Sequence, residues 1–86
     1  GVYCVNVIFK GNSYKGIANF GERPTVKGFN LLLETHIFEF NRDIYGKELT
    51  VEFLTFIRPE KKFKNFKSLT TQIKKDVITA KKYHKI

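Results

Sequence analysis

The stretch LLLETHIFEF, residues 31–40, is mostly aliphatic and aromatic. This composition is typical of a strand that enters a protein core. Two polar side chains, Glu34 and His36, interrupt the apolar run. Because residues two apart on a strand point to the same face, we expect Glu34 and His36 to share a face with Leu32 and Phe38.

Three other segments also predict strands, which span residues 2–9, 14–20 and 48–58. Gly and Asn in residues 10–13 are typical of a hairpin turn. Residues 21–30 contain two Gly, one Pro and few apolar side chains, so they predict a loop of about ten residues, long enough for a functional flap. The last strand is expected to gather one apolar face from odd positions: Leu49, Val51, Phe53 and Ile57.

After residue 64 the apolar spacing changes to that of an amphipathic helix, expected at about 66–83 with Asn65 as its cap. The stripe consists of Phe66, Leu69, Ile73, Val77 and Ala80. Four antiparallel strands do not close a barrel comfortably. Since the chain also opens inside its first predicted strand, we expect further strands upstream of Gly1.

Composition limits the possible functions of the 86 residues, which we expect to form one domain. A single cysteine excludes an internal disulfide and fits a reducing, cytoplasmic setting. No apolar run has the length of a membrane span. The net charge of +8 comes entirely from residues 58–86, which indicates either an anionic partner or a solvated helix face.

The pair formed by Glu34 and His36 has two interpretations. A polar pair on a strand usually faces solvent. If this face instead opened on a ligand cleft, Glu34 would be placed to act as a general base, and burial would raise its pKa. Metal binding by Glu-x-His is a weak prediction, because no third ligand is evident.

Several motifs resemble riboflavin kinase, and more narrowly the C-terminal kinase module of bacterial bifunctional riboflavin kinase/FAD synthetases. They are GIANFGERPTV at 16–26, LETHIFEF at 33–40, DIYGKELTVEFLTFIRPEKKF at 43–63 and QIKKD at 72–76. The resemblance covers essentially residues 1–86. It implies a mainly β fold, an antiparallel six-stranded Greek-key barrel with a C-terminal α-helix, here without its first strands.

The resemblance also implies a reaction, the transfer of the ATP γ-phosphate to the riboflavin 5′-hydroxyl to give FMN. The family's proposed base matches Glu34. Arg23 and Thr25 match a flap over the substrates, Tyr45 a contact near adenine, and Arg58 the flavin side of the cleft. Three of these residues also have an alternative interpretation without a role in substrate binding. Arg23 would be a solvated loop residue, Tyr45 would fill a hydrophobic turn, and Arg58 would form a salt bridge with Glu60. His36 is expected to support the site by packing or hydrogen bonding.

One departure from the family pattern concerns Mg²⁺ and ATP. The family binds Mg-ATP through a G-x-P-T-A-N segment that residues 1–86 lack. We therefore expect no metal ligands in this chain, the Mg²⁺ ligands upstream of Gly1, and little kinase activity from residues 1–86 alone. An adenylyltransferase domain is expected to precede the module in the full protein.

Two rival functions remain from sequence alone. A small basic β-barrel with many aromatic residues could bind nucleic acid, although the positive charge is confined to the last third of the chain. The chain could also be a structural remnant in which Glu34 has no catalytic role.

Overall fold

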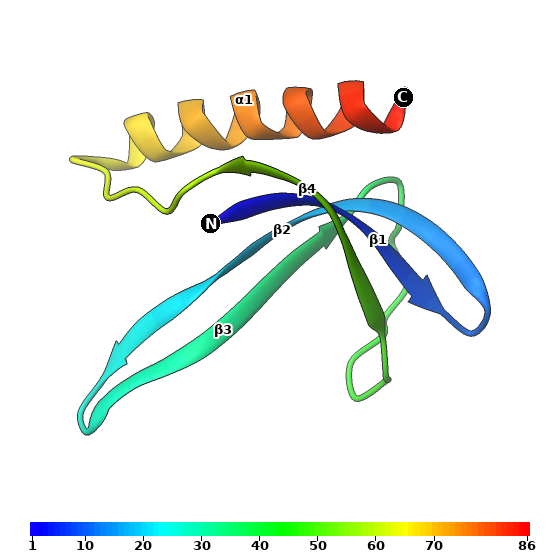
Figure 1. Cartoon of the computed structure of the whole chain (residues 1–86), viewed down its shortest axis with the longest axis horizontal. Coiled ribbons are helices and arrows are strands. Elements are labelled where there is room, and N and C mark those ends of the chain that lie inside the picture. The colour runs from blue at the N-terminus through cyan, green and yellow to red at the C-terminus, as the bar shows by residue number, and fades with distance from the viewer.

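A computed structural model describes all 86 residues as one four-stranded antiparallel sheet crossed on one face by a helix (Figure 1). The sheet order is β3-β2-β1-β4, so β3 and β4 are its open edges. The four strands and the C-terminal helix are confirmed, and the sheet is open. The elements are β1 (Val2–Phe9), β2 (Asn12–Thr25), β3 (Gly28–Ile37), β4 (Thr50–Arg58) and α1 (Phe66–His84).

The predicted ten-residue loop at 21–30 is wrong, because most of it belongs to a long β2–β3 ribbon. Only Val26 and Lys27 lie between the two strands. β1 begins at Val2, opposite Asn19, so from Gly21 onward β2 has β3 as its only partner strand. A two-stranded ribbon accepts Pro24, whereas the centre of a sheet would not.

The ribbon also corrects the expectation that residues 31–40 enter a core. Leu31, Leu32 and Leu33 are 62%, 43% and 40% exposed, because they pair with β2 beyond the end of β1. β3 ends at Ile37, and Glu39 adopts a positive φ of 55°. Only Ile37 and Phe38, at the end of this stretch, are buried.

Two small clusters of buried residues lie on opposite faces of the sheet. Val5, Val7, Ala18 and Ile37 form the cluster on the face away from the helix. The second cluster lies between the sheet and α1, where Cys4, Phe38 and Ala80 pack with Ile17, Ile57 and Val77. Burial raises the pKa of the Cys4 thiol, so this group is a packing residue and not an activated nucleophile.

Irregular pairing of β4 with β1 corrects the expected apolar face of the last strand. Register shifts lie between Val2 and Tyr3 and between Cys4 and Val5. Bulges of this kind interrupt the alternation of side chains between the two faces of a strand. As a result Phe56 packs edge-on against Tyr3 on the far face, while Ile57 packs beneath α1.

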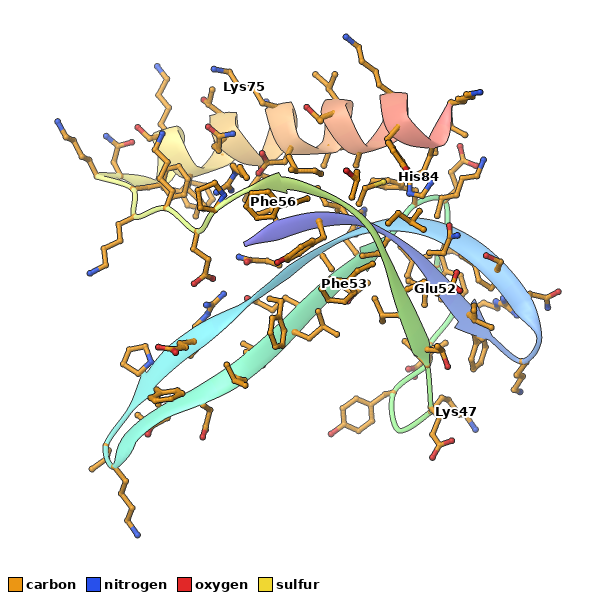
Figure 2. The ribbon with its side chains drawn as sticks, viewed as in Figure 1. Lys47, Glu52, Phe53, Phe56, Lys75 and His84 are labelled. Atoms are coloured by element: carbon orange, nitrogen blue, oxygen red, sulfur yellow. The ribbon has the colours of Figure 1, made fainter.

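The apolar stripe of α1 packs on the sheet only in its C-terminal half. Ala80 is fully buried, whereas Phe66 and Ile73 are 80% and 48% exposed. His84 points from the last turn toward the sheet, where its Nε2 lies 3.1 Å from the Gly16 carbonyl oxygen (Figure 2). The Asn65 cap is confirmed, since its Oδ1 accepts a hydrogen bond from the Ser68 N–H at 2.8 Å.

The lysines of α1 mostly face solvent, and Figure 2 shows Lys75 projecting away from the sheet. The chain contains no helix with the length and apolar character that a bilayer crossing requires.

The contact of Ala80 with the sheet gives a stability prediction. Ala80→Leu forces extra volume between Cys4 and Phe38, which should lower the free energy of unfolding by about 1–3 kcal/mol. Thr79→Leu, on the exposed side of the same helix, is the control and should change it far less. Urea denaturation of both variants measures the difference. Equal effects would show that α1 does not dock through Ala80.

Candidate active site

One transverse row of the sheet contains two of the expected site residues, Glu34 and Arg58. Glu34 of β3 pairs with Asn19 of β2, Asn19 pairs with Val2 of β1, and Val2 pairs with Arg58 of β4. Directly paired residues in antiparallel strands point to the same face. The row therefore presents Glu34, Asn19 and Arg58 together on the face that α1 crosses.

A cleft of about 980 Å³ lies over this row. Its floor is the sheet, and its other walls are the first half of α1 and the segment that follows β4. Leu69, Ile73 and Val77 supply an apolar wall from α1, while residues 60–63 supply a mostly charged one. The partial docking of α1 thus leaves room for a ligand next to Glu34.

Arg23 links two carboxylates across the cleft. Its Nη2 donates to Glu34 Oε1 at 2.6 Å, and its Nη1 donates to Glu60 Oε1 at 2.7 Å. The Glu60 carboxylate lies directly over Gly21, where a Cβ atom would come within 2.3 Å of it. The hydrogen bond from Arg23 lowers the pKa of Glu60, and the bonds from Glu60 and Glu34 raise the pKa of Arg23.

Arg58 joins the sheet to the helix through Asp76. Its Nε and Nη2 both donate to the Asp76 carboxylate, at 2.8–3.0 Å, and its Nη1 donates to the Pro59 carbonyl oxygen. Asp76 is only 4% exposed and also accepts a hydrogen bond from Gln72 at 3.0 Å. This two-point contact holds the middle of α1 above the row.

The structure brings three of the expected site residues together: Glu34, Arg23 and Arg58 all line the cleft. His36 lines it as well and packs its ring edge-on against Phe38, with centroids 5.6 Å apart. The expectation that a polar side chain at this place on the strand faces solvent is confirmed for Glu34, whose side chain is 57% exposed.

Two expected residues lie away from the cleft. Thr25 ends β2 at the tip of the ribbon. Tyr45 is 95% exposed in the β3–β4 connection, so it is not a plug for that turn. Neither residue lines the cleft.

The alternative interpretations of the two arginines, a solvated loop residue and a salt bridge to Glu60, are also wrong. Arg23 is not a solvated loop residue, since it lies on β2 with two ion pairs. Arg58 pairs with Asp76, while Glu60 pairs with Arg23. The sequence analysis missed the roles of Asn19 and Asp76. For Asp76 a signal existed, because the acid lies on the inner side of the helical stripe, between Ile73 and Val77.

No group of three or more His, Cys, Asp or Glu side chains could hold a metal ion. The three carboxylates that bind arginine here, Glu34, Glu60 and Asp76, are already matched to Arg23 and Arg58. These residues therefore do not fit a magnesium site.

Comparison with known proteins gives consistent matches. Residues 1–84 match the family model described as flavokinase, riboflavin kinase. A bifunctional riboflavin kinase/FMN adenylyltransferase from Haemophilus influenzae is 50% identical over 84 residues, covering 96% of this chain and 27% of that protein. The Escherichia coli K12 protein of the same name is 38% identical over 84 residues, with the same coverage.

Two further matches differ in name. The RNA-binding riboflavin kinase RibR of Bacillus subtilis is 44% identical over 79 residues, covering 90% of this chain and 34% of that protein. A crystal structure of a Streptococcus pneumoniae protein described as a macrolide-efflux protein aligns with a TM-score of 0.86 and 36% identity, covering 94% of this chain and 27% of that one. The chain thus spans roughly a quarter to a third of the relatives described here.

The ion pair under α1 gives a second stability prediction. Asp76→Asn leaves Arg58 mostly buried without its counter-charge, which should cost about 3–5 kcal/mol of unfolding free energy. Asp43→Asn is the matched control, because Asp43 is exposed and caps a turn through an oxygen that asparagine keeps. Guanidinium denaturation of the two variants compares them. A loss below about 1 kcal/mol for Asp76→Asn would contradict the role of the pair.

The Arg23 contacts give a prediction about pH. Because Arg23 lowers the pKa of Glu60, their bond stabilises the fold above the carboxyl's ordinary pKa and is lost as pH falls through the lowered value. Arg23→Gln should therefore return the Glu60 pKa upward toward its ordinary range. Carbon-detected NMR titration of the carboxyl measures this shift, with Glu48 as an exposed reference. An unchanged Glu60 titration would show that the bond does not persist in solution.

Proposed function

This chain belongs to the riboflavin kinase family, and from that premise we propose that residues 1–86 supply the riboflavin site and the general base of a kinase. The reaction is the transfer of the ATP γ-phosphate to the riboflavin 5′-hydroxyl, giving FMN. The main support for this proposal is that Glu34 lies in the floor of a large cleft, with Asn19, Arg23 and Arg58 around it.

Glu34 is the proposed acceptor of the hydroxyl proton. Its ion pair with Arg23 uses Oε1, so Oε2 can accept a hydrogen bond from the substrate. Phosphoryl transfer depends mainly on positioning the nucleophile and balancing charge, and a positioned base assists by taking the proton. The exposed carboxylate can be reached from the cleft without a change in the sheet.

Arg23 and Arg58 have different proposed roles. Arg23 is only partly covered and bonds to both Glu34 and Glu60, so it orients the base. Arg58 gives Nε, Nη2 and Nη1 to Asp76 and Pro59, so it shapes the flavin side of the cleft chiefly by fixing α1. The apolar wall from Leu69 and Ile73 suits the flat ring of a flavin.

The remaining components are proposed from the relatives' names and from the family pattern. ATP is the phosphoryl donor, and Mg²⁺ is expected to accompany it on ligands outside residues 1–86. We propose an FMN adenylyltransferase domain in the full protein, N-terminal to this chain, as in a bifunctional enzyme. The buried free thiol of Cys4 fits a cytoplasmic location. Thr25 and Tyr45 are also proposed as substrate contacts. They would contact parts of the substrates that extend beyond the cleft.

The nucleic-acid alternative has weaker support. A shallow groove outside the start of α1 is lined by five lysines, Lys61, Lys62, Lys64, Lys67 and Lys75. The name of RibR says that this relative binds RNA. Lysines alone do not identify a nucleic-acid site, and the larger cleft is built of paired charges and apolar side chains. We therefore keep riboflavin phosphorylation as the proposal.

Substitution of the proposed base tests this function. In the full-length protein, Glu34→Gln should lower the rate of FMN formation roughly 10²–10⁴-fold, because glutamine cannot take the proton. The fold should persist, since the side chain is exposed. Steady-state assays with riboflavin and ATP measure the rate, and Glu48→Gln, an exposed residue outside the cleft, is the control. A rate unchanged by Glu34→Gln would remove Glu34 from the mechanism.

A further inference from the structure

Asn19 has an unsatisfied polar group in the floor of the cleft. It stands in the transverse row between Glu34 and Val2, and it lines the cleft. Its carboxamide oxygen, Oδ1, is buried and has no hydrogen-bond partner. Most buried polar atoms in proteins are hydrogen-bonded, so an exception needs an explanation.

Donors of three residues around the row make their hydrogen bonds to other acceptors. Arg23 gives its Nη1 and Nη2 to Glu60 and Glu34. Arg58 is engaged by Asp76 and by the Pro59 carbonyl oxygen. The Gly1 amino group donates to the Phe20 carbonyl oxygen at 2.6 Å. The row thus keeps one acceptor without a donor, directly beside the proposed base.

From this geometry we propose that Asn19 is a substrate-positioning residue whose carboxamide oxygen accepts a hydrogen bond from a ribityl hydroxyl of riboflavin. This inference rests on the proposed function, because it places riboflavin in the cleft. The hydroxyl concerned is a neighbour of the terminal one that Glu34 deprotonates. The oxygen is enclosed, but a turn of the carboxamide about its terminal torsion, which is soft, presents it to the cleft.

Riboflavin has two kinds of hydrogen-bond donor, the ribityl hydroxyls and the imide N–H of the flavin ring. The position of Asn19 shows which of them it can bind. Cross-strand partners such as Asn19 and Glu34 have Cβ atoms about 4.5–5.5 Å apart. Hydroxyls on adjacent carbons can span that interval, one to each side chain. The imide N–H of the flavin ring lies at the opposite end of the molecule from the 5′-hydroxyl, so it cannot reach Asn19 while the 5′-hydroxyl is at Glu34.

Such a contact would serve catalysis by fixing the flexible polyol. A ribityl chain has several rotatable bonds, and a second anchor beside the base restricts the 5′-hydroxyl to the reactive orientation. A site that hydrogen-bonds a hydroxyl also discriminates against analogues that lack it, because its buried polar group is then left unpaired. Asn19 would therefore contribute to selectivity for flavins with an intact side chain.

The test compares Asn19→Leu and Asn19→Ala with the unchanged full-length protein. Leucine removes the acceptor at similar volume, and alanine removes it without filling the space. The ligands are riboflavin, 4′-deoxyriboflavin, and lumiflavin, which carries the flavin ring without the ribityl chain. Binding is measured by the change in flavin fluorescence, and thermal unfolding is measured for each variant.

We expect both variants to bind riboflavin roughly tenfold or more weakly and to bind lumiflavin as the unchanged protein does. The unchanged protein should bind 4′-deoxyriboflavin more weakly than riboflavin, and the substitutions should then cost little further affinity. Asn19→Leu should unfold at a temperature no lower than the unchanged protein, because it removes an unsatisfied buried acceptor.

Other outcomes would overturn the inference in distinguishable ways. If the unchanged protein binds and phosphorylates riboflavin but both variants bind it equally well, the role of Asn19 is wrong while the proposed function stands. If the variants lose lumiflavin and riboflavin affinity alike, or unfold earlier, Asn19 is structural. If the unchanged full-length protein neither binds nor phosphorylates riboflavin, the proposed function itself falls, and the inference falls with it.

Discussion

The ion pair between Arg58 and Asp76 is the contact on which the cleft depends. It ties the end of β4 to the middle of α1 with two parallel hydrogen bonds at a place where both groups are largely covered. The C-terminal half of α1 rests directly on the sheet through Ala80 and His84. The ion pair fixes the middle of α1 over the sheet, and Leu69 and Ile73, which precede Asp76 on the helix, line the space above the row.

Charge within the cleft is arranged around its arginines. Glu34 and Glu60 share Arg23, and Asp76 has Arg58. In each of these pairs an arginine balances the charge of its carboxylate, and the bond from Arg23 lowers the pKa of Glu60. This pairing also means that substrate must compete with Arg23 for one carboxylate or use the second oxygen of Glu34. In the proposed mechanism the substrate uses the second oxygen of Glu34, so Arg23 keeps its bond to Glu34 and orients it.

Much of the fold could be predicted from sequence where the signal is local. The alternation in β1 and the helical spacing after Asn65 gave correct elements, because each depends on neighbours in the chain. The loop at 21–30 was wrong because Gly and Pro are local breakers, while pairing of Pro24 with Phe29 across the ribbon is decided by the partner strand. The bulges in β4 depend on its register with β1, which no pattern within β4 reveals.

The site was predictable to a smaller degree. Family resemblance selected Glu34, Arg23 and Arg58, which the structure gathers in one cleft. It did not reveal that Asp76 holds Arg58, since that contact joins two elements 18 residues apart. Nor could it reveal Asn19. That residue stands out because its buried Oδ1 has no hydrogen-bond partner, which only the three-dimensional packing shows.

The most direct measurement is a crystal structure of the full-length protein with riboflavin bound. We expect the flavin ring against Leu69 and Ile73 and the 5′-hydroxyl within about 2.6–3.2 Å of the Glu34 carboxylate, a distance at which a base can take a proton. Riboflavin bound outside this cleft, or in it with the ribityl end directed away from Glu34, would contradict the account.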